Sequence, residues 1–138
     1  MGGHMSDLQI AGLYVGLNLL IILVLAGIVV SHRRRSQVSL GHGDDERLLQ
    51  ATRSHGNATE YLPMALIALV VMALIETPHW GLHLAGGTLT IARILHGTGL
   101  LTKPGRTFGR FTGTLLTWLV YIGCALWLIL QALLPSGF

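Results

Sequence analysis

Residues 8–31, LQIAGLYVGLNLLIILVLAGIVVS, decide the fold of this chain. A helix needs about 20 consecutive apolar residues to cross the hydrocarbon core of a bilayer, which is about 30 Å thick. This stretch has that length, its only strongly polar interior residue is Asn18, and it ends in SHRRR at positions 31–35. The apolar region of a cleaved signal peptide would be only about 7–15 residues long. We therefore predict a membrane-spanning helix that stops at a cytoplasmic arginine cluster.

The composition of the whole chain extends this prediction. Its 138 residues are 51% hydrophobic and only 11% charged, and the mean hydropathy is +0.63. Soluble domains usually contain about a quarter charged residues. Three further apolar stretches follow the first, so we predict an all-α integral membrane protein, a bundle of four transmembrane helices. The predicted helices cover residues 8–31, 45–75, 81–101 and 110–134.

The first five residues, MGGHM, resemble the remnant of an expression tag ahead of a native start at Met5. We therefore expect a single membrane domain over residues 6–138. Cys124 is the only cysteine and lies in the last apolar stretch, so no disulfide within the chain is possible.

Several residues predict how the helices begin, bend and pack. The acidic run at 44–46 suits the first turn of a helix, where the helix dipole favours negative charge, and Pro63 should kink that helix. The break at 76–80 is so short that the helices on either side must be antiparallel neighbours, with Trp80 as an interfacial anchor. The small residues of the third stretch allow close approach of another helix, and Asn18 is expected to bond a neighbouring helix. These small residues are Ala85, Gly86, Gly87 and Ala92.

The distribution of the nine Lys and Arg residues predicts the orientation. Five lie between the first span and the membrane half of the second helix, which begins near Tyr61; its first half, with Arg47 and Arg53, is predicted to be aqueous. Three lie between the third span and the start of the fourth, and Arg93 lies inside the third. Because short loops rich in Lys and Arg stay in the cytoplasm, both loops are predicted to be cytoplasmic, and both termini are predicted to face the periplasm or another non-cytoplasmic space. A bacterial inner membrane is the expected location. Topology also accounts for the net charge of +3, so no nucleic-acid partner is predicted.

Two stripes of polar residues are the candidates for chemistry. Arg53, Asn57 and Glu60 have the spacing of one helix face, and Arg93 with His96 forms a stripe on the next helix. Since the two helices are antiparallel, the stripes can face each other near the cytoplasmic end. Ionisable groups at membrane depth are costly and are functional candidates by default. The cluster suits a small zwitterion with several carboxylates, but an interhelical salt bridge between Glu60 and Arg93 would be a purely structural alternative.

A metal site is not predicted. His79 is expected in the non-cytoplasmic loop and His83 at the start of the third helix, whereas His55 lies on the opposite membrane side. Metal ligands must converge on one point, and these three histidines do not.

The same stripes resemble a known family. Residues 53–63 read R-x-x-x-N-x-x-E-Y-x-P and residues 93–96 read R-x-x-H. With the arginines at 33–34, these motifs resemble the MAPEG family, the membrane-associated proteins in eicosanoid and glutathione metabolism. The resemblance covers nearly the whole chain, and its second-helix motif is the more specific part.

The resemblance implies a homotrimer that binds glutathione between subunits near the cytoplasmic face and takes a lipophilic electrophile or lipid hydroperoxide from the bilayer. An arginine near the start of the fourth helix would activate the thiol; Arg110 is preferred, and Arg106 would bind a carboxylate. Several members have a tyrosine where this chain has Leu100, which puts any mechanism needing that hydroxyl in doubt. The implied glutathione-binding residues are Arg33 of a neighbouring subunit, Arg53, Asn57, Glu60, Tyr61, Arg93 and His96.

Three functions are compatible with the resemblance. The first is a microsomal-type glutathione transferase or peroxidase that generates a thiolate. The second is a non-catalytic lipid-binding membrane protein of the same fold, and the third is an isomerase with glutathione as its cofactor. The retained arginines, Asn57 and Glu60 favour the first.

Overall fold

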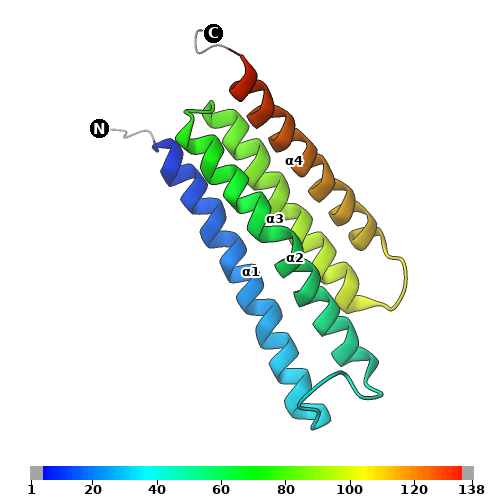
Figure 1. Cartoon of the computed structure of the whole chain (residues 1–138). Helices are drawn as coiled ribbons and strands as arrows, with labels where there is room; N and C mark the ends of the chain where they lie inside the picture. Colours follow the sequence, from blue (N-terminus) through cyan, green and yellow to red (C-terminus); the bar gives the residue numbers. More distant parts are fainter. Residues whose placement is uncertain (1–4, 135–138) are drawn as a thin grey trace.

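Four helices and short connections form residues 5–134, the part of the chain that the computed structural model describes (Figure 1). The helices are α1 (Asp7–Ser36), α2 (Glu46–Leu74), α3 (His79–Thr102) and α4 (Phe108–Leu133). The prediction of an all-α four-helix bundle is therefore confirmed. Most of the proposed tag, residues 1–4, and the predicted domain's last residues, 135–138, lie outside the described residues.

The protein is a multi-pass membrane protein. Among the described residues, α1, α2 and α4 are long and apolar enough to cross a bilayer. The helix α3, with 24 residues, is long enough but less apolar. The polar side chains of α3 include His79, His83, Arg93 and His96. Because α3 contacts all three other helices, Arg93 and His96 are buried, whereas His79 and His83 nearer its start are exposed.

The first helix ends later than predicted. It continues for five residues beyond Ser31, through the arginine cluster, and stops at Gln37, whose φ of 55° is left-handed. Arginine is a good helix former, and positive charge is favoured in the last turn because it faces the negative end of the helix dipole. The connector therefore begins at Gln37 and not at Arg33.

The start of α2 follows the predicted acidic run, with Asp45 as the residue that caps the helix. Its carboxylate accepts hydrogen bonds from the backbone N–H groups of Arg47 and Leu48, at 2.9 and 3.1 Å, and from the Ser36 hydroxyl. The bond from Ser36, followed by those from the backbone, lowers the pKa of Asp45 below its ordinary value. A charged cap therefore ties α2 to the end of α1.

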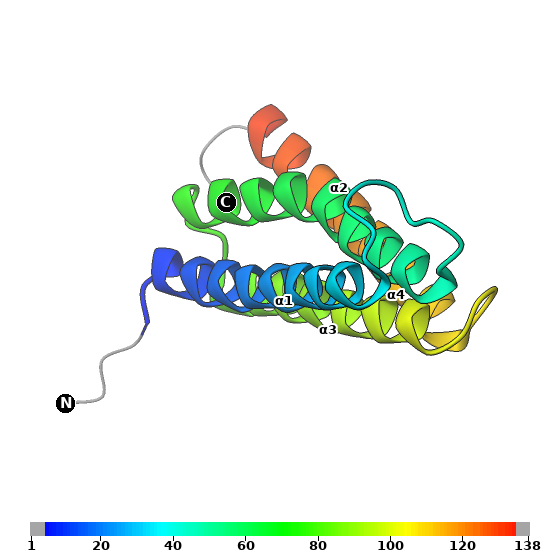
Figure 2. The ribbon, with the colours of Figure 1, turned by 90° about the horizontal axis from the view of Figure 1, so that it is seen from below.

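The predicted bend in α2 and the turn that follows it set the direction of α3. Pro63 lies inside α2, and the helix changes direction along its length (Figure 2). Proline removes one helical hydrogen bond and crowds the preceding turn, which bends a helix. The turn after α2 is shorter than expected, because α3 already begins at His79; this histidine belongs to the helix and not to the loop.

The two long connections, α1–α2 and α3–α4, lie at one end of the bundle, and the α2–α3 turn lies at the other (Figure 1). We call the first the basic end, because eight of the nine Lys and Arg residues lie in or near its two connections. The antiparallel pairing predicted for α2 and α3 is confirmed. Assignment of the basic end to the cytoplasm stays a prediction.

Small residues let α3 pack closely against its neighbours. A Cβ atom on Gly113 of α4 would come within 2.6 Å of the Ala92 carbonyl oxygen, and one on Gly99 within 2.6 Å of the Arg110 backbone nitrogen. On the other side of α3, the ring of Tyr14 lies directly over Gly86. The close approach predicted for Gly86 and Ala92 is thus confirmed.

Asn18 also performs its predicted role. Its side-chain amide donates to the Thr90 hydroxyl of α3 at 2.9 Å and to the Tyr14 carbonyl of its own helix at 2.8 Å. The bond to Thr90 connects α1 to α3, whereas the buried Asn18 Oδ1 has no hydrogen-bond partner among the described residues.

Candidate functional site

The polar cluster is centred on Arg93 of α3, whose side chain is only 2% exposed. Its guanidinium donates to Asn57 Oδ1 of α2 at 2.9 Å. It also donates to the Gly113 carbonyl at 3.3 Å and to the Thr117 hydroxyl, both on α4. One buried cation therefore joins three helices, and the predicted meeting of the Asn57 and Arg93 stripes is confirmed.

Tyr61 covers the same guanidinium from α2. The centre of its ring lies 5.6 Å from the central carbon of the Arg93 guanidinium, within the range of a cation–π contact. Tyr121 of α4 packs edge-on against this ring and donates its hydroxyl to the Tyr61 carbonyl. The phenol of Tyr61 accepts a hydrogen bond from Trp118 at 3.4 Å. Aromatic side chains thus close one side of the cluster.

One donor of Arg93 remains free. Its Nε is buried and has no hydrogen-bond partner among the described residues. A buried donor without a partner costs roughly 1–3 kcal/mol. The cluster therefore retains an unused hydrogen-bond donor on a buried positive charge.

Arg53 and Glu60 do not join this buried cluster. Both are exposed on α2, and within residues 5–134 no ion pair connects Glu60 to Arg93. The structural salt bridge considered as an alternative is therefore wrong for the described part of this chain. Half-buried Asn57 lies between the exposed pair on α2 and the buried guanidinium.

His96 lies at the tight contact between α3 and α4. It is buried, and a Cβ atom on Gly113 would come within 2.7 Å of its backbone nitrogen. The structure therefore places His96 one turn from Arg93 toward the basic end, in the helix contact rather than on an open surface.

The remaining arginines lie at the basic end. Arg33 donates to carbonyl groups of the α1–α2 connection, including that of Gly41 at 2.9 Å. Arg110 is half-buried in the first turn of α4 and donates to the Gly105 carbonyl, whereas Arg106 is exposed. These three arginines are not brought into contact with Arg93 by the described hydrogen bonds.

Sequence reasoning missed the contribution of α4 to the cluster. Thr117 and the Gly113 carbonyl hold the far side of the Arg93 guanidinium, and Tyr121 supports Tyr61. The spacing of Gly109 and Gly113, G-x-x-x-G, is a known signal for close helix packing in membranes. That signal could have placed α4 against Arg93.

Together these features define a class of protein. It is a four-helix integral membrane protein that holds a buried arginine between three helices, next to an exposed face with charges of both signs. Arginine provides forked donors that match carboxylates, so such a site is suited to a polar ligand with carboxylate groups at the boundary of the membrane.

Comparison with known proteins agrees with this class. The sequence model of the MAPEG family matches residues 11–130, and the chain belongs to that family. It is also similar to the inner membrane protein YecN of Escherichia coli K12, with 32% identity over 124 residues, which cover 90% of this chain and 89% of YecN. YecN of the strain E. coli O6:H1 matches to the same extent.

Proposed function

We propose that this protein is a membrane-bound, glutathione-dependent transferase or peroxidase. The observation that carries the proposal is the hydrogen bond between Arg93 and Asn57, which joins the two halves of the family motif into one cluster. Arg53 and Glu60 remain exposed beside it. Their opposite charges match the carboxylates and the amine of a tripeptide zwitterion.

The proposed chemistry needs a thiolate. A nearby guanidinium favours the charged form and lowers the pKa of a thiol, and Arg110 has this role in the proposal. In conjugation, the thiolate sulfur forms a bond to an electrophilic carbon of the second substrate, and the leaving group departs with the electron pair. In peroxide reduction, the thiolate sulfur attacks the peroxide oxygen, the O–O bond breaks, the alcohol leaves after protonation and the sulfur becomes a sulfenic acid. The thiol of a second glutathione then attacks this sulfur, which forms the disulfide and releases water.

A second and a third copy of the chain complete the proposed site. Arg53 and Glu60 lie on the surface of the single chain, so a ligand bound to them would be open on one side. We propose a homotrimer in which a neighbouring subunit, with its Arg33, covers this face. We further propose that the basic end faces the cytoplasm in a bacterial inner membrane, the membrane named for the YecN relatives.

Removing the guanidinium of Arg110 is expected to lower thiolate formation. In wild-type protein, added glutathione should show thiolate absorbance near neutral pH, and Arg110→Ala should diminish it because the thiol pKa returns toward its ordinary range, about 8.5 for a cysteine thiol. Ultraviolet absorbance during a glutathione titration measures this. Arg106→Ala should weaken binding but keep the absorbance of bound thiolate, and Arg35→Ala should change neither. If Arg106→Ala removes the thiolate absorbance and Arg110→Ala does not, Arg106 activates the thiol and Arg110 binds the carboxylate.

Neutralising Glu60 is expected to separate ligand binding from assembly. Glu60→Gln keeps the shape of the side chain but removes the charge that would pair with the glutathione amine, so glutathione affinity should fall while the trimer persists. Calorimetry and light scattering in detergent measure the two properties. Glu46→Gln, an exposed acid at the same end of the bundle, is the control. Equal loss of binding and assembly would assign Glu60 to subunit contacts.

One observation favours a non-catalytic binding protein as the second candidate. Arg33 and Arg110 already donate to backbone carbonyls of their own connections, which occupies part of their hydrogen-bonding capacity. If the wild-type protein gives no calorimetric binding at millimolar glutathione, this second function is favoured. A screen of thiols against model electrophiles would identify both substrates of an enzyme.

A further inference from the structure

The connection between α3 and α4 brings the first turn of α4 onto the last turns of α3. Residues 103–107 join the two helices. A Cβ atom on Gly99 of α3 would lie 2.6 Å from the Arg110 backbone nitrogen, and one on Gly109 would lie 2.6 Å from the Leu95 carbonyl oxygen. No side chain fits into such a space, so glycine at both positions permits the contact. The backbone of Arg110 therefore rests directly on α3.

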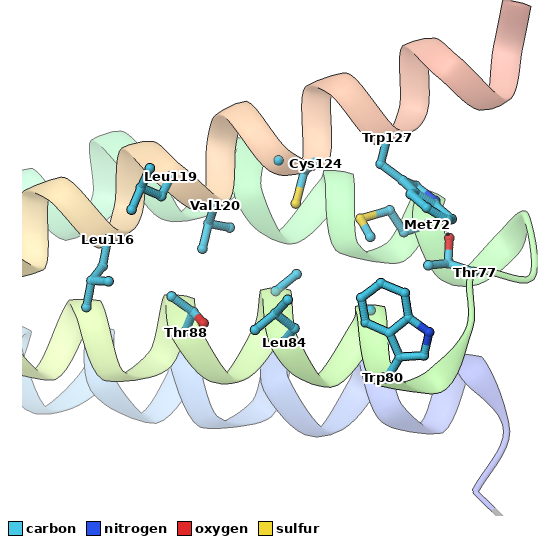
Figure 3. Close-up of a pocket in the computed structure, with 13 residues that line it drawn as sticks. Met72, Thr77, Trp80, Leu84, Thr88, Leu116, Leu119, Val120, Cys124 and Trp127 are labelled. Carbon is cyan, nitrogen blue, oxygen red and sulfur yellow. Dashed lines mark hydrogen bonds between the residues drawn. The ribbon is translucent and has the colours of Figure 1, made fainter.

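This close contact is local to the start of α4. Farther along, an apolar pocket lies between the two helices and extends from Leu116 to Trp127 on α4 (Figure 3). The tight glycine contacts, at Gly99, Gly109 and Gly113, all lie on the basic-end side of this pocket. The position of Arg110 therefore depends on the contacts at the α3–α4 connection, where the two helices meet most closely.

Thr107 connects the two helices with its hydroxyl. It is the residue that caps α4, and its side chain accepts a hydrogen bond from the Arg110 backbone N–H at 3.2 Å. The same hydroxyl donates to the Gly99 carbonyl of α3 at 2.9 Å. One hydroxyl can form both bonds, because it has one proton to donate and lone pairs that accept. The cap of α4 is thus also a tie between α4 and α3.

The guanidinium of Arg110 is held by the same connection. It donates to the Gly105 carbonyl, and Gly105 has a φ of 90°, a left-handed conformation that favours glycine. Arg110 is half-buried, whereas Arg106 in the same connection is exposed. The backbone and the side chain of Arg110 are therefore both attached to residues just before α4.

The place of Arg110 in α4 makes it sensitive to this cap. Arg110 lies in the first turn, since Thr107 is the capping residue and α4 begins at Phe108. The N–H groups of a first turn lack helical partners, and a capping side chain stabilises them. A cation lowers the pKa of a thiol only within roughly 4–6 Å, and a displacement of about 1 Å can cost a rate about 100-fold. Loss of the cap would therefore move the cation relative to a bound sulfur.

We propose that Thr107 is a positioning residue for the thiol chemistry: its hydroxyl fixes the first turn of α4 on Gly99 and thereby keeps Arg110 beside the glutathione sulfur. This inference rests on the proposed function, in which Arg110 favours the thiolate. In this role Thr107 acts through Arg110 and needs no contact of its own with the ligand.

An ultraviolet pH titration of bound glutathione tests the positioning. Thr107→Val removes the hydroxyl and keeps the branched shape, so the pKa of the bound thiol should rise by about one pH unit, which is about a tenfold loss of thiolate below the midpoint. Thr107→Ser keeps a hydroxyl and should titrate as the wild type does. Thr102→Val is the matched control and should leave the thiol pKa unchanged. The Thr102 hydroxyl donates to the same Gly99 carbonyl, at 3.3 Å, but makes no described hydrogen bond with Arg110.

Hydrogen exchange provides a readout that does not need glutathione. In Thr107→Val the Arg110 amide loses its acceptor, and its exchange, measured by NMR in detergent micelles, should become at least about tenfold faster. It should keep the wild-type rate in Thr107→Ser and Thr102→Val. If Thr107→Val does not fold, Thr107→Gly replaces it in both measurements, because glycine is a tolerated capping residue without a hydroxyl.

The two readouts distinguish failure of this inference from failure of the proposed function. Unchanged exchange at Arg110 in Thr107→Val would overturn the inference whether or not glutathione binds. Faster exchange with an unchanged thiol pKa would also overturn it, because Thr107 would then cap α4 without placing the guanidinium. If the wild type binds no glutathione, the proposed function fails, and the inference fails with it even where exchange follows the expected pattern.

Discussion

Replacing Gly113 with valine is expected to force α3 and α4 apart and destabilise the protein by about 3 kcal/mol or more, the upper part of the range for overpacked cores. A Cβ atom at this position would lie 2.6 Å from the Ala92 carbonyl oxygen and 2.7 Å from the His96 backbone nitrogen. Both are backbone atoms of a helix, so they cannot move aside alone. Thermal unfolding in detergent, followed by circular dichroism, measures the loss.

Gly123→Val is the matched control for this prediction. It makes the same substitution in the same helix, but a Cβ atom at Gly123 has nothing within 4 Å. We expect its unfolding temperature to stay close to that of the wild type. If Gly113→Val unfolds at the same temperature as Gly123→Val, the close contact between α3 and α4 does not exist in the folded protein.

Replacing Arg93 with methionine is expected to lower both stability and glutathione affinity. Methionine fills a similar volume, but Asn57 Oδ1 and the Gly113 carbonyl lose their charged donor. Hydrogen bonds to charged groups contribute about 1.5–3 kcal/mol, so stability should fall by a similar amount. Affinity should fall roughly thirtyfold or more if the guanidinium also holds a ligand carboxylate. Calorimetry and thermal unfolding measure the two effects.

Arg53→Met separates these two effects. Arg53 is exposed, so the variant removes the same charge without breaking a buried hydrogen bond. We expect weaker glutathione binding with unchanged unfolding. If Arg93→Met loses stability but binds glutathione as the wild type does, Arg93 is a structural residue and the proposed site needs another carboxylate partner.

Hydropathy and spacing predicted most of the fold. The starts and ends of α2, α3 and α4 lie within two residues of the predicted ones, because loops with Pro, Gly or acidic residues interrupt the apolar stretches. The exception is the end of α1 at Ser36. A charged run marks where lipid ends, but it does not stop a helix, since arginine continues a helix well in water.

The candidate site was predictable in part. Helical spacing brought Asn57 and Arg93 together correctly, because the short turn between α2 and α3 leaves only an antiparallel pairing. Glu60 was expected to be a possible partner of Arg93, but it lies on the exposed face of α2. Helical spacing identifies a face of α2 but not which side chain on that face points at a partner. The rotation of α2 about its own axis, which tertiary packing sets, brings Asn57 rather than Glu60 to Arg93.

The partners from α4 depended on a different signal. Thr117 reaches Arg93 only because Gly113 allows α4 to approach α3 so closely. Charge and hydropathy do not show such a contact, because glycine and threonine contribute little to either. The contacts that Gly113 and Thr117 of α4 make with Arg93 are therefore visible only in the structure.

The low hydropathy of α3 has a consequence for how the protein is made. A helix that holds a buried arginine and three histidines gains less than its neighbours from leaving the translocon for lipid. Its Arg93 donates to groups on α2 and α4, and its Thr90 accepts from Asn18 of α1. Insertion of this segment and tertiary assembly are therefore coupled during biosynthesis. The full thermodynamic benefit of placing α3 across the bilayer is reached only when α4 has also been synthesised.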